Sequence, residues 1–269
     1  MNYKAPAKLN LFLHINKRRC DGYHELQTLF QLIDYCDELS FELRSGGEIN
    51  INCNIDIPYH DNLVFKAARL LQKYRGVSVG ADIYLHKHIA LGAGLGGGSS
   101  NAATTLKALN RLWDCRLDNK QLMACGKELG ADVPLFIAGH SAWGEGIGDS
   151  LQAVDLPPRW YTVFIPPYRC DTQLMYQAAK LKRDCTVVSI EDYFAGRTIN
   201  VFEAVIRHRY PLIADAMDWL NDRSTAYLSG SGGAFFAVSE TEQQAIALSE
   251  DHPSYLQSFI ARGINQSPT

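Results

Sequence analysis

A glycine-rich segment of the chain has the residue types that could hold a phosphate group. Residues 91–100, LGAGLGGGSS, contain five glycines and two serines. Glycines this dense cost chain entropy, but they let the backbone approach a ligand closely and adopt positive φ angles. The apolar residues that follow recur at helical spacing, which predicts an amphipathic helix, at Ala102, Leu106, Leu109 and Trp113.

The start of that helix favours an anion. A helix N-terminus presents unpaired N–H groups and the positive end of the helix dipole, and Ser99 or Ser100 is expected to cap it. A flexible linker or a crowded turn is the alternative interpretation. The predicted phosphate cradle consists of Ala90, Leu91, Gly92, Ala93, Gly94, Leu95, Gly96, Gly97, Gly98, Ser99 and Ser100.

Neither common nucleotide motif fits this segment well. Gly92, Gly94 and Gly97 satisfy G-x-G-x-x-G, but a dinucleotide site also needs an acidic residue at a strand end about twenty positions later. Asp114 and Asp118 lie near that distance, in a stretch that is typical of a helix end and a turn. A P-loop is excluded because no Lys-Ser or Lys-Thr closes the glycine run.

Two other positions could supply a cation and a carboxylate. Lys8 and Asn10 fall on one face of an alternating segment, and Asp132 lies in GADVPLF. Alone, Lys8 is typical of a solvated surface lysine, and Asp132 before Val133-Pro134 is typical of a helix cap. Together with a phosphate cradle they are the parts of phosphoryl transfer: positioning, charge neutralisation and a group that orients or deprotonates the attacking hydroxyl.

The remaining pattern predicts the elements that position these groups. Apolar alternation and turn residues predict strands over 5–16, 26–34, 38–43, 48–52, 82–91, 159–166, 225–230, 233–239 and 254–261. Helical periodicity predicts helices over 62–74, from 102 onward, and over 119–129, 172–180 and 200–220. Asp118 and Gln121 resemble a capping box for the 119–129 helix, with Gly130 as its stop.

The distribution of these elements predicts an α+β protein of two domains. Strands are grouped with helices and do not alternate strictly with them. Pro157-Pro158 would interrupt any regular element, so the boundary is placed there. The expected domains are 1–155 and 156–269.

Composition narrows the classes of partner. A formal charge of −3 argues against a general nucleic-acid binder, which needs clustered Lys and Arg. The seven cysteines are odd in number and contain no C-x-x-C pair, so neither a disulfide framework nor a zinc site is predicted. No apolar stretch approaches the roughly 20 residues of a membrane span. A cytoplasmic protein without membrane or nucleic-acid partners is expected, and its oligomeric state stays open.

Five ordered motifs resemble the GHMP kinases, the family of galactokinase, homoserine kinase and mevalonate kinase. They are PAKLNLFLHI, DGYHELQTLFQLID, GLGGGSSNAAT, LGADVPLFIAGHSAWGEGIG and SGSGG. The resemblance implies a mixed-sheet N-terminal ATP-binding domain and a ferredoxin-like C-terminal domain. It also implies a small-molecule kinase that uses ATP and Mg²⁺ on the 2-hydroxyl of an alcohol carrying a cytidine diphosphate group, in the non-mevalonate route to isoprenoid precursors.

The resemblance gives roles to the charged residues. Asp132 is implied as the base that accepts the hydroxyl proton, Lys8 as its electrostatic partner, and Asn10 as a substrate contact near Lys8. The sequence departs from the family pattern at Ala90, where Pro is frequent, and at Ser231, where Thr is frequent. Neither change removes a needed group. No metal ligand is predicted.

Three aromatic residues are implied to bind the cytosine base. Tyr23 and His24 match the family's base pocket, one stacking on the ring and one hydrogen-bonding its edge. Tyr176 is the candidate for the second stacking aromatic, with ordinary core packing as the alternative. A kinase for a small amino acid has no use for such a pair, and a catalytically silent nucleotide-binding module would not need Lys8 and Asp132.

Overall fold

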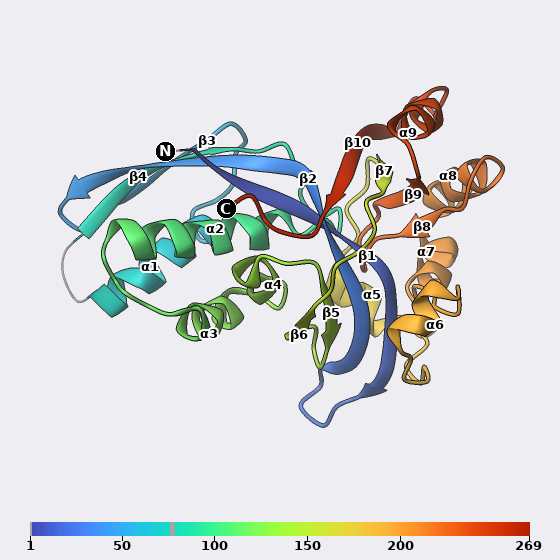
Figure 1. Ribbon diagram of the computed structural model, residues 1–269, viewed down its shortest axis with the longest axis horizontal. Coiled ribbons are helices and arrows are strands. Elements are labelled where there is room, and N and C mark those ends of the chain that lie inside the picture. The colour runs from blue at the N-terminus through green and yellow to red at the C-terminus, as the bar shows by residue number, and fades with distance from the viewer. Residues whose placement is uncertain (1, 76–78) are drawn as a thin grey trace.

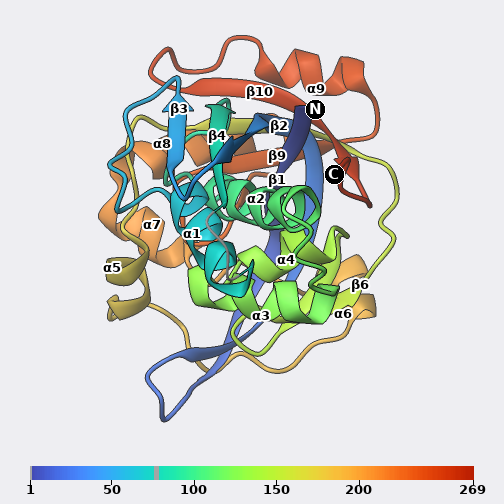
Figure 2. The same cartoon turned by 90° about the vertical axis from the view of Figure 1, so that its left-hand side faces the viewer.

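A mixed sheet backed by four helices forms the N-terminal half of the chain. The computed structural model describes residues 2–75 and 79–269. The strands are β1 (Asn2–Arg18), β2 (His24–Ser45), β3 (Ile49–Cys53) and β4 (Val79–His86); β3 and β4 are parallel and the other neighbours antiparallel. The helices α1 (Leu63–Arg75), α2 (Gly97–Leu112), α3 (Asn119–Leu129) and α4 (Val133–Ala138) lie beneath these strands in two views (Figures 1 and 2).

The first two strands form a long hairpin that runs through both halves of the molecule (Figure 1). The predicted strands 26–34 and 38–43 are wrong as separate elements, because Cys36 and Asp37 between them still pair with Pro6 and Ala5 of β1. The β1–β2 ladder shifts register between Asn10 and Leu13. This irregularity brings Leu13 to the same cavity as Lys8 and Asn10.

The C-terminal half is a ferredoxin-like unit. The strands β7 (Trp160–Ile165), β8 (Tyr227–Leu228), β9 (Phe235–Ser239) and β10 (Gln257–Ile264) are antiparallel and lie in the order β10-β7-β9-β8. With helices between β7 and β8 and between β9 and β10, this is the βαββαβ pattern. The helices are α5 (Thr172–Gln177), α6 (Ile190–Phe194), α7 (Glu203–Arg209), α8 (Pro211–Asn221) and α9 (Glu242–Ser249). The α+β class and both predicted architectures are confirmed.

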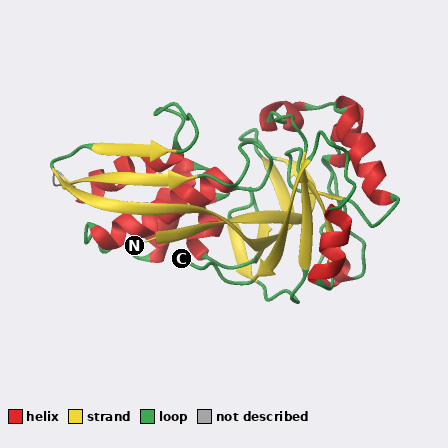
Figure 3. Cartoon of the chain, turned by 90° about the horizontal axis from the view of Figure 1, so that it is seen from above, coloured by secondary structure: helices red, strands yellow, loops and turns green. Residues whose placement is uncertain are grey.

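Strand pairing joins the two halves. The end of β10 pairs with β2 through Gly263–Ile33 and Ile264–Leu32, so one ten-stranded sheet spans the molecule (Figure 3). The chain therefore returns to the N-terminal half after residue 262. A short hairpin, β5 (Ala142–Glu145) with β6 (Ser150–Ala153), also attaches to β2. The domain boundary near residue 155 stays a prediction.

The helix predictions succeed where caps are local. Helix α3 has the predicted bounds 119–129, with the Asp118–Gln121 capping box formed and Gly130 at its end. Helix α2, however, is capped by Gly96 and not by Ser99 or Ser100, because Gly96 adopts a left-handed conformation and starts the helix earlier. The predicted helix 200–220 is divided into α7 and α8 at Tyr210, before Pro211.

A buried ion pair fixes the chain where it enters the glycine-rich loop. The carboxylate of Asp37 is fully buried and accepts hydrogen bonds from the Lys87 ammonium, from Asn101 Nδ2 at 2.8 Å, and from the backbone N–H groups of His88 and Ile89 at 2.7 and 2.8 Å. These backbone groups bond to a side chain and not to a neighbouring strand. Strand β4 therefore ends at His86, and the predicted continuation to residue 91 is wrong.

Every helix in the described ranges is too short or too polar to cross a lipid bilayer. Those residues also contain no disulfide bond.

Replacing Lys87 with Met is expected to destabilise the fold by about 3–5 kcal/mol, because it leaves the Asp37 carboxylate buried without its cation. Urea unfolding measures the change. Arg116→Met is the control, since its ion pair with Asp114 is exposed and such pairs contribute less than about 1 kcal/mol. A loss of the same small size in both variants would show that the buried pair does not hold the loop entrance.

Candidate active site

A cavity of about 300 Å³ lies where the two halves of the chain meet. The N-terminal half contributes β1, β2, the glycine-rich loop and the start of α4; the C-terminal half contributes α5 and the loop after β8. Among the lining residues are Lys8, Asn10, Thr28, Asp132 and Tyr176. The structure therefore brings together four of the residues that the sequence predicted for catalysis and substrate binding, from segments far apart in the chain.

Lys8 is a buried cation beside a carboxylate. Its Nζ lies 3.6 Å from Asp132 Oδ2, and its side chain is 4% exposed whereas that of Asp132 is 36% exposed. Burial lowers the pKa of Lys8, and the charge of Asp132 and a hydrogen bond to it act in the opposite direction. The Lys8 backbone N–H donates to Leu95 O at 3.0 Å, which ties β1 to the glycine-rich loop.

Asn10 and Thr28 form a hydrogen-bonded chain that ends at Lys8. The Thr28 hydroxyl donates its only proton to Phe12 O at 2.5 Å, so it can only accept from Asn10 Nδ2, at 2.9 Å. This fixes the orientation of the Asn10 amide. Its Oδ1 therefore faces the Lys8 ammonium and accepts a hydrogen bond from it.

Asp132 is positioned by the start of α4 but does not cap it. Its backbone is already helical, with φ −84° and ψ −12°, and its side chain makes no capping hydrogen bond. The capping interpretation therefore does not account for this residue. Pro134 in the first turn helps to start the helix and leaves the carboxylate available to the cavity.

The glycine-rich loop packs against the loop that follows β8. Gly92, Gly94 and Gly96 have positive φ angles of 72°, 85° and 73°. A Cβ on Gly94 would lie 2.5 Å from Ser229 O, and one on Gly96 would lie 2.8 Å from Phe136 Cζ. These glycines are thus required by contacts within the protein. Of the predicted cradle, Gly94, Gly96 and Ser99 line the cavity.

Of the three predicted base-binding aromatics, His24 and Tyr176 are in contact and Tyr23 is exposed beside them in the chain. His24 stacks on Tyr176 with ring centroids 5.2 Å apart and planes at 29°. Tyr23 is 61% exposed, in the turn between β1 and β2 that projects at the lower edge of Figures 1 and 2. His24 Nε2 is buried and has no hydrogen-bond partner, and burial together with the charges of Arg183 and Arg18 lowers the pKa of His24.

Comparisons with known proteins agree with this geometry. The sequence profile "GHMP kinases N terminal domain" matches residues 62–140. The chain is 47% identical to a 4-diphosphocytidyl-2-C-methyl-D-erythritol kinase of Nitrosococcus oceani, covering 98% of this chain and 95% of that protein. A Methylococcus capsulatus protein of the same name is also 47% identical, with 98% and 91% covered. The chain belongs to the 4-diphosphocytidyl-2-C-methyl-D-erythritol kinase family.

A solved structure supports the same assignment. A crystal structure titled 4-(cytidine 5'-diphospho)-2C-methyl-D-erythritol kinase superposes with a TM-score of 0.85 and 34% identity, covering 98% of this chain and 99% of that chain. The resemblance to the GHMP kinases is confirmed. As a member of this family, the chain is a small-molecule kinase.

Sequence reasoning missed two hydroxyl residues of this cavity, Thr28 and Thr172, and the hydrogen-bond partners of Ser229 and Ser231. Thr28, Thr172 and Ser231 line the cavity, and Ser229 Oγ accepts from the Asn10 backbone N–H at 3.3 Å. Ser231 Oγ donates to Thr172 Oγ1 at 3.3 Å. The spacing of Thr28 carries no signal, because its role appears only through the pairing of β1 with β2. The SGSGG motif did point to Ser229 and Ser231, but not to their partners.

Three glycines of this segment differ in how closely the rest of the protein packs against them. Gly94→Ala is expected to lower the melting temperature, because its Cβ meets Ser229 O, and Gly97 is equally crowded by Ile89 Cγ2 at 2.8 Å. Gly98→Ala is expected to fold normally, since its Cβ meets only Leu63 Cδ1 at 3.5 Å. Differential scanning calorimetry compares the variants, and equal melting temperatures for all three would contradict the packing argument.

Thr28→Val is expected to lower kcat and to move the alkaline limb of its pH profile to lower pH. Without the hydroxyl acceptor, the Asn10 amide is free to rotate and present its NH₂ group to Lys8, which disfavours the ammonium and lowers the pKa of Lys8 further. Thr28→Ser keeps the hydroxyl and should restore both kcat and the profile. If Val and Ser variants shared one pH profile, the hydroxyl would have only a packing role.

Proposed function

We propose that the chain transfers the γ-phosphoryl group of ATP to the 2-hydroxyl of 4-diphosphocytidyl-2-C-methyl-D-erythritol, in the non-mevalonate route to isoprenoid precursors. The observation that carries this proposal is the placement of Lys8 Nζ 3.6 Å from Asp132 Oδ2 in a cavity that the glycine-rich loop and the first turn of α2 also line. These groups supply a cation, a carboxylate and anion-binding N–H groups, which phosphoryl transfer requires.

Asp132 and Lys8 divide the chemistry between them. Asp132 accepts the proton of the substrate 2-hydroxyl while the hydroxyl oxygen forms a bond to the γ-phosphorus of ATP. The bond between the γ-phosphorus and the bridging β-phosphate oxygen breaks, which releases ADP. The Lys8 ammonium lies beside the Asp132 carboxylate and stabilises negative charge on the transferring group. Because Lys8 is nearly excluded from water, this stabilisation is stronger than an exposed lysine would provide.

The start of α2 is the proposed site for the ATP phosphates. Its first N–H groups have no partners within the helix, and the helix dipole adds a partial positive charge. In the described residues, no three carboxylate, imidazole or thiol groups cluster as a metal site. This suits Mg²⁺ brought by ATP, because Mg²⁺ commonly uses substrate phosphates, water and few protein ligands. The hydroxyl of Ser99, which lines the cavity, would be one such protein ligand. The bound ion would supply positive charge to neutralise the phosphates.

The proposed cytosine site is the pair formed by His24 and Tyr176. Tyr176 lines the catalytic cavity and packs edge-on against Phe202, with ring centroids 4.8 Å apart, so its ring is held in place. The buried His24 Nε2 lacks a partner and suits a hydrogen bond to a base edge. Tyr23, exposed in the adjoining turn, is available to stack on the base from outside.

Release of ADP measured with four acceptors tests the proposed substrate. Rapid turnover is expected with 4-diphosphocytidyl-2-C-methyl-D-erythritol and none with homoserine, mevalonate or galactose. Preference for one of the other three would assign a different GHMP activity. ATP binding without turnover of any acceptor would indicate a catalytically silent nucleotide-binding module.

Asp132→Asn is expected to lower kcat by about 10²–10⁴ while both substrates still bind, because the basic carboxylate is lost. Steady-state assays of ADP release measure kcat, and isothermal titration calorimetry measures the binding of each substrate. Asp118→Asn is the matched control: Asp118 caps α3 and accepts from Gln121 N at 2.8 Å, and Asn caps as well as Asp. Its kcat should not change.

Lys8→Met should also depress kcat, and the Lys8→Met/Asp132→Asn double variant should lose less than the product of the single effects, since the two groups act as a unit. A folded Asp132→Asn enzyme with near-normal kcat would remove the catalytic assignment.

A further inference from the structure

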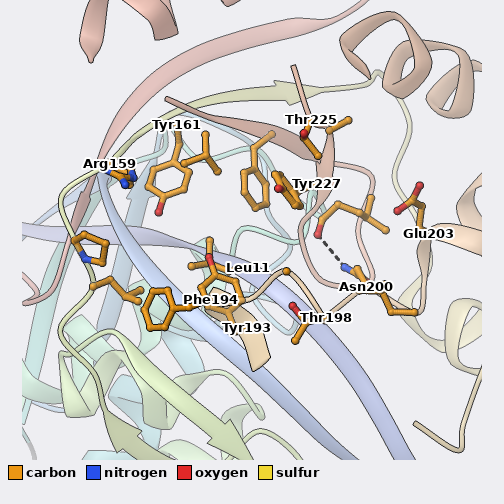
Figure 4. A pocket seen from close by; sticks show the side chains of 18 residues that line it. Leu11, Arg159, Tyr161, Tyr193, Phe194, Thr198, Asn200, Glu203, Thr225 and Tyr227 are labelled. Atoms are coloured by element: carbon orange, nitrogen blue, oxygen red, sulfur yellow. Dashed lines mark hydrogen bonds between the residues drawn. The ribbon is translucent and has the colours of Figure 1, made fainter. Parts of the chain in front are cut away.

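A second and larger cavity lies in the C-terminal half. Its volume is about 480 Å³, and it shares no lining residue with the catalytic cavity. It lies between β7–β9 and the segment around α6 (Figure 4). Volumes of 300–1,000 Å³ are typical of small-molecule sites. Nothing in the proposed phosphoryl transfer uses this space.

Five of its eighteen lining residues are aromatic. Tyr161 and Phe236 are buried lining residues, and Tyr161, Tyr193, Phe194 and Tyr227 are seen around the space in Figure 4. Phe194 and Tyr227 are 58% and 41% exposed, although rings of this size are normally covered. Tyr227 and Phe236 lie nearly parallel, with centroids 5.6 Å apart and planes at 27°. Such walls favour a flat, conjugated ring.

One lining charge is available to a ligand. Arg159 is 38% exposed and its ion-pair partner, Glu240, is 3.5 Å away and 76% exposed, so this pair is weak and readily exchanged. The cavity's carboxylate, Glu203, is already paired with Arg207 at 2.8 Å. The available charge is therefore positive, and a guanidinium is suited to a carboxylate, sulfonate or phosphate.

Asn200 connects this cavity to the catalytic one. It lines the aromatic cavity, and its Nδ2 donates to Leu228 O and Gly230 O, both at 2.9 Å. The dashed line at Asn200 in Figure 4 is the first of these bonds. Gly230 lines the catalytic cavity and packs so closely on Asn10 that a Cβ there would lie 2.9 Å from Asn10 Oδ1 and 3.5 Å from Lys8 Nζ. One side chain thus holds the loop that contacts the catalytic lysine.

We infer that the aromatic cavity is a second ligand site, for a planar aromatic compound with an anionic group, and that its occupant acts on catalysis through Asn200 and the 228–230 loop. A ligand seated between Tyr193 and Tyr227 contacts the wall that Asn200 forms. A shift of that wall moves Gly230 against Asn10 and Lys8. The site is distinct from the sites proposed for ATP and for the cytidine substrate.

Anilinonaphthalene sulfonate, a fluorescent planar aromatic anion, tests the site by titration of the full chain. One saturable site per chain is expected, unaffected by a saturating non-hydrolysable ATP analogue. Tyr227→Ser and Arg159→Gln should each weaken binding about tenfold, in line with the strength of single ring and charge contacts. Tyr227→Phe, which keeps the ring, should bind normally. Circular dichroism confirms that each variant is folded.

Matched substitutions outside the cavity serve as controls. Tyr84, 42% exposed on β4, is replaced by Ser, and Arg116 by Gln; both variants should bind the probe normally. No saturable binding, equal binding in all variants, or displacement by the ATP analogue would overturn the site. Because this titration needs no turnover, its result is independent of the proposed kinase reaction.

Steady-state ADP release tests the coupling. Saturating probe should change kcat or the KM of the cytidine substrate at least about twofold in the native chain, and the same probe concentration should have a smaller effect on Tyr227→Ser, whose site is less occupied. Unchanged kinetic constants in the native chain at full occupancy would overturn the action through Asn200.

Discussion

The active site depends on a lysine ammonium that is almost excluded from water. Removing a charge from water is costly unless it is paired and hydrogen-bonded, and Lys8 satisfies this condition through Asp132, Asn10 and a ring face of Phe30, whose centroid is 5.7 Å away. Each partner is itself constrained. The first turn of α4 fixes the position of Asp132, and the hydroxyl of Thr28 fixes the orientation of the Asn10 amide. Together these two constraints place oxygen atoms around the Lys8 ammonium, which stabilises its charge.

Close contact between two loops of the protein explains the glycines of the glycine-rich segment better than phosphate binding alone. Gly94 lies under Ser229 O, and Gly232 lies so close to Ala93 that a Cβ would be 2.5 Å from its carbonyl carbon. The two glycine-rich loops, one from each half, therefore interlock at the backbone level, and Ala234 N–H donates to Ala93 O at 3.1 Å. The proposed phosphate cradle is built on this contact, which holds the two loops against each other without a nucleotide.

Sequence patterns predicted those features whose causes are local. The stripe Val64, Ala67, Ala68 and Leu71 is buried as the helical period required, and the capping box fixed the bounds of α3. The patterns failed where a distant partner decides. Asp37, which lies on β2, ends β4 by accepting hydrogen bonds from the backbone that follows it. The positive φ of Gly96 makes α2 start earlier than the sequence pattern predicts. Two side chains that are adjacent in the sequence can also point in different directions. His24 therefore stacks on Tyr176, whereas Tyr23 remains exposed.

The topology places the groups proposed to react on the N-terminal half of the chain. Lys8, Asn10, Thr28 and Asp132 all come from β1, β2 and the start of α4, and β1 and β2 are paired along most of their length. The groups proposed to react are thus held by one pair of strands and the start of one helix. Tyr176 and Ser231 come from the ferredoxin-like half, which meets the N-terminal half through the β10–β2 pairing and the interlocked loops. The proposed site therefore needs both halves of the chain, because Tyr176 and Ser231 complete the wall around the groups that β1, β2 and the start of α4 hold.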